Sequence, residues 1–226
     1  MRQFRMIIVK CRIKSVVTDI KIMKEIDYYF TAPSPWAYLA APRFNALVQT
    51  KALVVNWKPI DLFEVFALNG QKKVKDRPPS IQVNRLNELK RWGKFLNMEI
   101  NIEPKYFPVN PDTANKFLIA ASIINIDIAR LATALMTAVW VEEKDIADLN
   151  TLIAIANKNG EDGRLLSELS REDRVQDRLE INTKEAIARN VFGSPTWIYQ
   201  GELFWGQDRL DFLERSVGNN SNDASS

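Results

Sequence analysis

Two short apolar stretches near the beginning of the chain have the character of buried strands. Residues 25–30 (EIDYYF) are mostly apolar, and residues 52–60 (ALVVNWKPI) are rich in β-branched and aromatic side chains. Between them, Ser34 stands directly before Pro35, a pairing preferred at the N-cap and first position of a helix, and we expect this helix to run to about Thr50. Because a helix of crossover length separates the strands, they are predicted to be parallel, as in a βαβ unit.

From Asp61 to about Asn182 the apolar positions recur at helical spacing, and strand signals largely disappear. One predicted helix carries an aliphatic stripe with further apolar side chains beside it: Ile128, Leu131, Leu135 and Val139, flanked by Ala132, Met136 and Trp140. Further helices are predicted at about 82–97, 112–123, 148–158 and 171–181. Ser170 and Asp173 resemble a capping box at the start of the last of these. The middle of the chain is therefore predicted to be a helical block.

Strand character returns at residues 196–205 (TWIYQGELFW), where two apolar runs surround Gln200-Gly201-Glu202. This pattern predicts a β-hairpin. A last helix is predicted from Gly206 to about Val217, and the polar residues 219–226 are predicted to be a disordered tail.

This order of elements predicts an α/β fold in which a thioredoxin-like fold is interrupted by a helical insertion domain. We expect residues 25–68 and 183–218 to form the thioredoxin-like domain, and residues 69–182 to form the insertion. Such a fold brings the start of the first helix and the loop before the hairpin into one site.

Residues 1–24 are predicted to be a basic leader outside the fold. They contain seven of the 31 Lys and Arg residues and one of the 28 Asp and Glu residues, so the net charge of +3 does not describe the rest of the chain. That rest carries 24 basic and 27 acidic side chains, which argues against a nucleic-acid surface. The leader lacks the apolar centre and cleavage site of a secretory signal. We interpret it as the product of an upstream start codon, with a true start near Met23 and a cytoplasmic location; an organellar presequence and a matrix location are the alternative.

Two absences limit the chemistry of the chain. It contains no histidine, and Cys11 in the leader is its only cysteine. A Ser-His-Asp triad, a Cys-His pair, a histidine-ligated metal, an internal disulfide and a CxxC centre are therefore excluded, and we expect no metal site. No apolar run reaches the roughly 18 residues that cross a bilayer, so we expect no integral membrane protein. A nucleophile must come from Ser, Thr, Lys, Tyr, a carboxylate or a bound cofactor.

Two loops give the first helix start a context beyond simple capping. Pro195 stands directly before the hairpin, where a cis proline would expose the N–H and C=O of Ser194 to an extended peptide; an ordinary trans proline is the alternative. Further on, Gly206 and Gln207-Asp208 begin a predicted helix, whose free N–H groups favour a carboxylate while Asp208 can accept from an ammonium group. Alternatively, Asp208 is a helix N-cap, and Trp205 is an aromatic residue of the core.

Four blocks in this sequence carry a specific resemblance. They are IDYYFTAPSPWAYLA, AVWVEEKDIAD, EAIARNVFGSPTWIY and ELFWGQDRLDFL, and they span the chain from about Glu25 to Val217. Together they resemble the 2-hydroxychromene-2-carboxylate isomerases, which are similar to kappa-class glutathione transferases and to DsbA-like proteins of the thioredoxin superfamily. The resemblance implies a homodimeric, glutathione-dependent cis-trans isomerase that acts on a small aromatic acid by reversible addition of the glutathione thiolate.

The resemblance also implies where glutathione binds. Its cysteinyl group would pair with the backbone of Ser194, beside Pro195, and its sulfur would meet Ser34, the expected catalytic residue. The hydroxyl of Ser34 would donate a hydrogen bond to the thiolate, whereas a cysteine there would form a mixed disulfide. The γ-glutamyl end would be held by a further segment, Trp205, Gly206, Gln207 and Asp208.

The substrate carboxylate is expected at the inner face of the helical block. By position, Arg77 with its neighbour Asp76, and Tyr106, are the candidates, with solvated surface and simple packing as the alternatives. Phe66 stands where the family pattern has a lysine, and residues 69–79 are unusually basic, so a different acid or electrophile is compatible with the sequence. A kappa-like transferase that conjugates electrophiles, and a non-catalytic module that binds an extended peptide, are the competing functions.

Overall fold

The computed structural model describes residues 24–219 of the 226-residue chain. The predicted leader, apart from Lys24, and the predicted tail, apart from Asn219, lie outside the described residues. Within residues 24–219, no helix is both long enough and apolar enough to span a membrane.

A four-stranded mixed sheet organises the fold. Its strands are β1 (Glu25–Phe30), β2 (Val54–Pro59), β3 (Thr196–Tyr199) and β4 (Glu202–Trp205), in the order β2-β1-β3-β4. β1 pairs with β2 in parallel and with β3 antiparallel, and β3 and β4 form the predicted hairpin. Gln200 and Gly201 turn the hairpin with φ values of 50° and 85°, as a two-residue turn requires. The predicted βαβ unit and hairpin are both confirmed.

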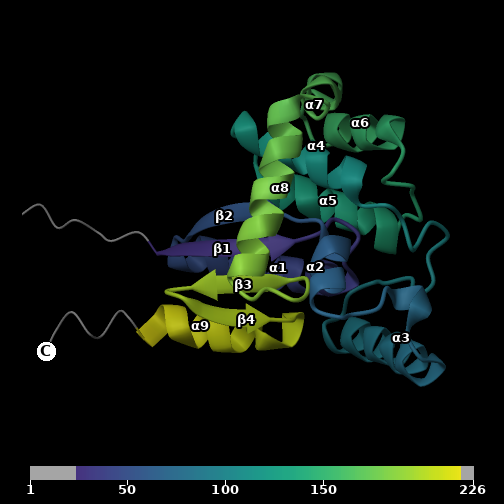
Figure 1. The fold of residues 1–226 in the computed structure, drawn as a ribbon, viewed down its shortest axis with the longest axis vertical. Coiled ribbons are helices and arrows are strands. Elements are labelled where there is room, and N and C mark those ends of the chain that lie inside the picture. Colours follow the sequence, from purple (N-terminus) through teal and green to yellow (C-terminus); the bar gives the residue numbers. More distant parts are fainter. Residues whose placement is uncertain (1–23, 220–226) are drawn as a thin grey trace, which may run out of the picture.

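Helices supply the rest of the structure (Figure 1). They are α1 (Pro35–Lys51), α2 (Leu62–Leu68), α3 (Pro79–Phe95), α4 (Asp112–Ile123), α5 (Ile128–Trp140), α6 (Leu149–Lys158), α7 (Gly163–Leu169), α8 (Asp173–Ala188) and α9 (Leu210–Asn219), with the short 3₁₀ helices η1 (Val74–Asp76) and η2 (Gln207–Arg209). The long block between β2 and β3 is helical, as expected. In sequence, this block separates β1 from β3, the strand that pairs with the other edge of β1.

The predicted helices are wrong in three respects. The helix predicted at 171–181 begins at Asp173 and continues to Ala188, and Glu172 is its N-cap, without a side-chain hydrogen bond. The Ser170 hydroxyl donates instead to the carbonyl of Ser167 at 2.9 Å, so there is no capping box. α7 was not expected at all. Because α8 runs without a break through residues 182 and 183, the division of domains at that point stays a prediction.

The two faces of the sheet bury different residues because side chains alternate along a strand. Tyr28 of β1 stacks on Phe30 (4.7 Å between ring centroids) and on Trp197 of β3 (5.4 Å), and Phe44 of α1 covers them. Tyr29 faces the opposite side, where it packs in a second cluster with Ala186 of α8. Figure 1 shows the same layering, with α8 across one face of the sheet and α1 behind it.

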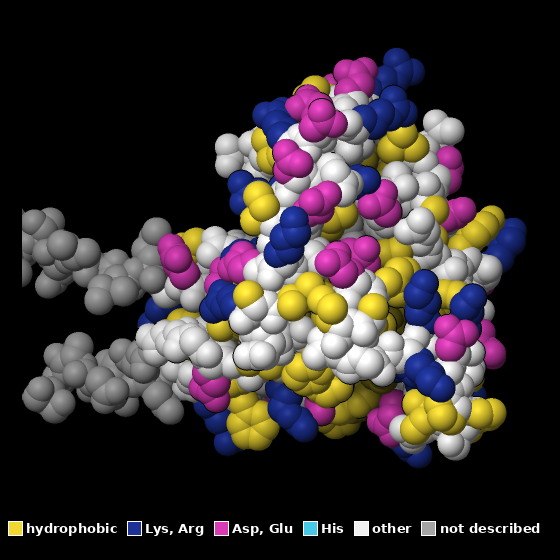
Figure 2. All heavy atoms as spheres, viewed as in Figure 1, with side chains coloured by type: hydrophobic (Ala, Val, Ile, Leu, Met, Phe, Trp, Pro, Cys, Tyr) yellow, Lys and Arg dark blue, Asp and Glu magenta, His cyan; other side chains and the backbone are white. Residues whose placement is uncertain are grey.

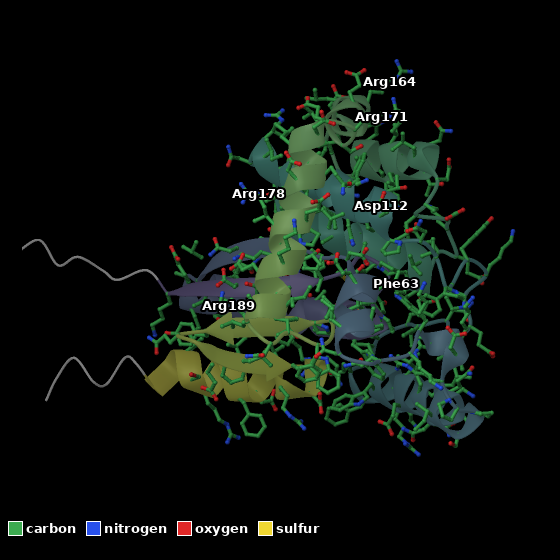
Figure 3. All side chains as sticks on the ribbon, viewed as in Figure 1. Phe63, Asp112, Arg164, Arg171, Arg178 and Arg189 are labelled. Atoms are coloured by element: carbon green, nitrogen blue, oxygen red, sulfur yellow. The ribbon has the colours of Figure 1, made fainter. Side chains whose placement is uncertain are left out.

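A cluster of charges joins α8 to the two parallel strands. Lys58 of β2 forms ion pairs with Asp27 of β1 (3.0 Å) and Glu185 of α8 (2.6 Å). Arg189 pairs with both of these carboxylates and donates a hydrogen bond to the Tyr29 hydroxyl. Figure 3 shows Arg189 close to the sheet, where α8 passes over it. We call these five side chains the sheet charge cluster.

Candidate active site

Ser34 begins α1 and has both hydrogen-bonding capacities in use. Its Oγ accepts from the Ala37 N–H at 3.2 Å, which makes it the N-cap, and it donates to the Ser194 carbonyl at 3.1 Å. The side chain is buried, and no acidic residue lies in the first turn of α1 to offset the positive end of the helix dipole. The structure therefore brings Ser34 and Ser194 together, as the sequence predicted.

The peptide bond between Ser194 and Pro195 is cis. Ser194 accepts a hydrogen bond from the Thr31 N–H through its side-chain oxygen, at 3.2 Å. Its carbonyl accepts from Ser34, and its own N–H has no acceptor within residues 24–219. One free backbone donor and one carbonyl with a spare lone pair are what a short extended peptide needs to pair as an added strand.

The third predicted segment lies next to the cis proline. The Gly206 N–H donates to the Pro195 carbonyl at 2.9 Å, and Gly206 has a φ of 95°, which suits glycine. The Trp205 ring packs so closely against Gly193 that a Cβ there would lie 2.1 Å from the indole nitrogen. Trp205 is nonetheless 47% exposed, so it is a rim residue and not the core aromatic of the alternative interpretation.

Gln207 and Asp208 differ in what they can offer a ligand. Gln207 is buried, and both its backbone and side-chain carbonyls accept hydrogen bonds from Arg43 of α1. The groups that Gln207 has left for a ligand are its side-chain amide nitrogen and its backbone N–H. Asp208 is partly exposed and pairs with the neighbouring Arg209 at 2.7 Å, so its carboxylate remains open to an additional cation. The N–H groups of Gln207 and Asp208 have no acceptor in the described part of the chain.

Asn115 of α4 is a site residue that sequence reasoning missed. It is buried, and its Oδ1 accepts from the Ala32 N–H at 3.0 Å while its Nδ2 donates to the Ile60 carbonyl at 2.9 Å. It also exchanges hydrogen bonds with the Thr31 hydroxyl. Asn115 thereby fixes the loop that presents Ser34. Asn115 lies among the polar residues at the start of α4, next to Lys116, so no local pattern singles it out.

The predicted substrate residues are not joined to this centre by any hydrogen bond or ion pair in residues 24–219. Arg77 donates from Nε to the Lys72 carbonyl at 3.0 Å, and its guanidinium lies 5.5 Å from the centre of the Phe66 ring. Asp76 is exposed at the end of η1. Tyr106 is half-buried, with the Lys105 ammonium 4.9 Å from its ring. Their roles stay predictions.

Metal-binding residues do not cluster in the part of the chain that the structure describes. Within residues 24–219 there is no group of three or more His, Cys, Asp or Glu side chains that could hold a metal ion. The polar groups that do converge are a serine hydroxyl, backbone N–H and C=O groups and one carboxylate. Such a set is chemically suited to a small peptide-like molecule.

Comparisons with known proteins agree with this geometry. The family model of the DSBA-like thioredoxin domain matches residues 25–218. A 2-hydroxychromene-2-carboxylate isomerase from Sphingobium xenophagum is 31% identical over 194 residues, which cover 84% of this chain and 96% of the relative. Glutathione S-transferase kappa 1 from Caenorhabditis elegans is 24% identical, over 84% of this chain and 89% of the relative.

Solved structures give the same result. The structure of a 2-hydroxychromene-2-carboxylate isomerase superposes with a TM-score of 0.76 at 26% identity, and the match covers 89% of this chain and all of that one. The likeness therefore extends over the sheet and the helical block together. On this evidence, the chain belongs to the DSBA-like thioredoxin family and, within it, to the 2-hydroxychromene-2-carboxylate isomerases.

Proposed function

We propose that this protein is a glutathione-dependent isomerase that acts on 2-hydroxychromene-2-carboxylate or a closely similar aromatic acid. The observation that carries the proposal is the contact between Ser34 Oγ, at the start of α1, and the carbonyl of Ser194, beside the cis bond to Pro195. The identity to curated isomerases supports the reaction class, and the kappa-class relative supports glutathione as the thiol.

The groups around Ser34 fit glutathione in particular. The free N–H and the carbonyl of Ser194 suit its cysteinyl unit, which presents one N–H and one C=O in an extended chain. Its γ-glutamyl end carries an ammonium and a carboxylate on one carbon. The Asp208 carboxylate suits the ammonium, and the unpaired N–H groups of Gln207 and Asp208 suit the carboxylate.

When bound, glutathione supplies a thiolate that adds reversibly to a conjugated double bond, so that the bond can rotate before elimination. Ser34 contributes the proton that stabilises this anion. Its hydroxyl turns from the Ser194 carbonyl towards the sulfur, while the N–H groups of the first turn of α1 add positive potential. Neither role requires an imidazole or a metal, in keeping with a chain that has no histidine.

Replacement of Ser34 tests this proposal directly. In Ser34→Ala we expect kcat for 2-hydroxychromene-2-carboxylate to fall at least about tenfold, because the charge-assisted hydrogen bond to sulfur is lost. The Kd for glutathione, measured by calorimetry, should change less than about threefold, because the peptide contacts remain. Loss of the cap should lower the free energy of unfolding by about 1 kcal/mol.

Ser122→Ala, an exposed serine at the end of α4, is the matched control and should behave as wild type. Unchanged turnover in Ser34→Ala would reduce Ser34 to a helix cap. If glutathione shows no binding at millimolar concentration, the proposal fails as a whole.

Kappa-class transfer of glutathione to an electrophile is the second candidate. It is favoured by the kappa-class relative and by Phe66, an apolar residue where the isomerase pattern has a lysine. The two reactions differ in the fate of glutathione. Analysis of products after many turnovers separates them, because the isomerase regenerates free glutathione and the transferase consumes it in a stable thioether.

A further inference from the structure

Arg85 of α3 is a half-buried cation that has no anionic partner in residues 24–219. Its guanidinium lies 5.0 Å from the centre of the Phe107 ring and 5.9 Å from that of Trp140. Its Nη2 atom is buried and has no hydrogen-bond partner, and within residues 24–219 the side chain forms no ion pair. The residue as a whole keeps some exposure, so solvent and solutes reach part of it.

A second cation, Arg77, adds to the excess of positive charge around Arg85. Arg77 is close enough to Arg85 to repel it, and this repulsion adds to the effect of burial, which lowers the pKa of Arg85 to about 10. Lys72, Lys73 and Lys75 precede Arg77 in the same loop. Figure 2 shows Lys and Arg side chains gathered on the side of the molecule where α3 and this loop lie.

Folding alone does not explain such a pair. A buried charge is strongly unfavourable unless an opposite charge and hydrogen bonds compensate it, and an apolar residue of similar size would usually serve packing better. Contact with Phe107 and Trp140 gives cation–π stabilisation, but it supplies no acceptor for Nη2. An anion from outside the chain would supply the missing partner.

The segment that follows α3 is connected to the Ser34 site at two points. The loop that carries Phe107 leads into α4, whose Asn115 fixes the backbone at Ala32. On the other side, the hydroxyl of Tyr38, in the first turns of α1, donates to the Glu99 carbonyl just after α3, at 2.6 Å. The segment that follows α3 is thus held to the start of α1 by Tyr38 and, through α4, by Asn115.

We propose that Arg85, together with Arg77, binds the carboxylate of a flat aromatic acid, with the rings of Phe107 and Phe66 beneath the two guanidinium groups. A planar guanidinium matches a carboxylate in two parallel hydrogen bonds, and the rings offer the apolar contact that an aromatic acid requires. The inference rests on the proposed function for the identity of the acid. It adds the group that selects an acid over a neutral compound.

Binding of an inert analogue tests this inference without turnover. Chromone-2-carboxylate has the bicyclic ring and carboxylate of the proposed substrate, and chromone has the same ring without the charge. We expect Arg85→Met to weaken binding of chromone-2-carboxylate about 10- to 100-fold, measured by calorimetry or tryptophan fluorescence, and to leave chromone binding unchanged. Arg91→Met, which removes the same charge from an exposed position of α3, should have no effect.

A second measurement excludes a purely structural role. Because Arg85 has no internal anion, the melting temperature of ligand-free Arg85→Met should equal or exceed that of wild type. Arg85→Lys keeps a charge without the planar fork and should restore only part of the affinity, so it serves as the test if Arg85→Met fails to fold.

Three results would overturn the inference: no binding of chromone-2-carboxylate to wild type, unchanged affinity in Arg85→Met, or equal loss of the acid and of chromone. Ser34→Ala should bind chromone-2-carboxylate as wild type does. Its glutathione affinity and turnover are measured separately, so failure of the Arg85 site and failure of the proposed function give different results.

Discussion

The Ser34 hydroxyl has one proton, which it donates to the Ser194 carbonyl. That carbonyl has a second lone pair for the N–H of a bound peptide. A serine in this position can therefore move its proton to a nearby sulfur anion without leaving a buried carbonyl unsatisfied. A cysteine would replace this donor by a second nucleophile, which would compete with the thiol of the proposed cofactor.

Ser34→Cys makes this argument testable. In a Cys11→Ser background, treatment with glutathione disulfide should convert the introduced thiol to a mixed disulfide with release of one glutathione, because the start of α1 lowers the pKa of a thiol placed there. Intact-protein mass spectrometry measures the adduct. The control is Ser122→Cys in the same background, which should react more slowly at low pH. Equal rates for the two variants would contradict a thiolate-stabilising site.

Residues near a local signal were predictable, and residues defined by remote contacts were not. Ser34 was predictable because serine before proline is typical of a helix start. Pro195 was predictable because it stands directly before a strand. Asn115, by contrast, contacts Ala32, 83 residues away, and Arg43 contacts Gln207, 164 residues away. No spacing rule reaches across such distances. Arg85 gave no signal either, because an arginine on a helix normally faces solvent.

At the level of elements, α4 holds the loop between β1 and α1 in place through a single side chain. Asn115 satisfies the buried Ala32 N–H and the Ile60 carbonyl, which belong to the ends of two neighbouring strand connections. We predict that Asn115→Leu lowers the free energy of unfolding by about 3 kcal/mol, because these backbone groups lose their partners in a buried site.

Urea unfolding measures this change, and the same variant should lose glutathione affinity as the loop shifts. Asn87→Leu, at an exposed position of α3, is the control and should leave both quantities unchanged. If Asn115→Leu is as stable as wild type, the hydrogen bonds of Asn115 do not hold the loop.

The extent of α8 shows why helix ends were harder to predict than helices. Asn182 and Thr183 are poor helix formers, which is why the sequence placed an end there. In the structure the Asn182 amide donates to the Pro59 carbonyl at 3.1 Å, and the Thr183 hydroxyl accepts from the Asp61 N–H at 2.9 Å. These tertiary hydrogen bonds to the end of β2 outweigh local propensity and extend the helix across the sheet.

For the molecule as a whole, the sheet charge cluster predicts sensitivity to acid. Burial alone would raise the pKa of Asp27, but hydrogen bonds from Arg189, Lys58 and Asn56 hold it below 3.8. Burial would also raise the pKa of Glu185. Hydrogen bonds from Lys58 and Tyr29 nevertheless hold it below 4.5. Carboxylates with lowered pKa values stabilise the fold above their ordinary pKa and lose that contribution as pH falls through the folded value.

The free energy of unfolding should therefore hold steady near neutral pH and decline below about pH 4.5. Urea unfolding at a series of pH values measures the decline. Lys58→Met should make it shallower, since it removes a partner of both carboxylates, whereas Lys90→Met on α3, an exposed lysine, should leave it unchanged. A decline of equal steepness in Lys58→Met would exclude this cluster as the cause.

The architecture was the most predictable level of all. The change from strand pattern to helical spacing and back again marks the insertion, and a hairpin with a glycine turn marks the return to the sheet. Such patterns extend over many residues, so local exceptions do not obscure them. The charge cluster could not be anticipated in the same way, because Lys58 and Glu185 meet only once α8 crosses the strands.

The distance in sequence between Ser34 and Ser194 has a consequence for folding during synthesis. A ribosome adds about 5–20 residues per second, so the 160 residues between them take about 8–30 seconds to appear. During this interval β1 has β2 on one side and an open edge on the other. The nascent chain therefore passes through a stage in which its helical part has emerged while one edge of β1 can still pair with a foreign strand.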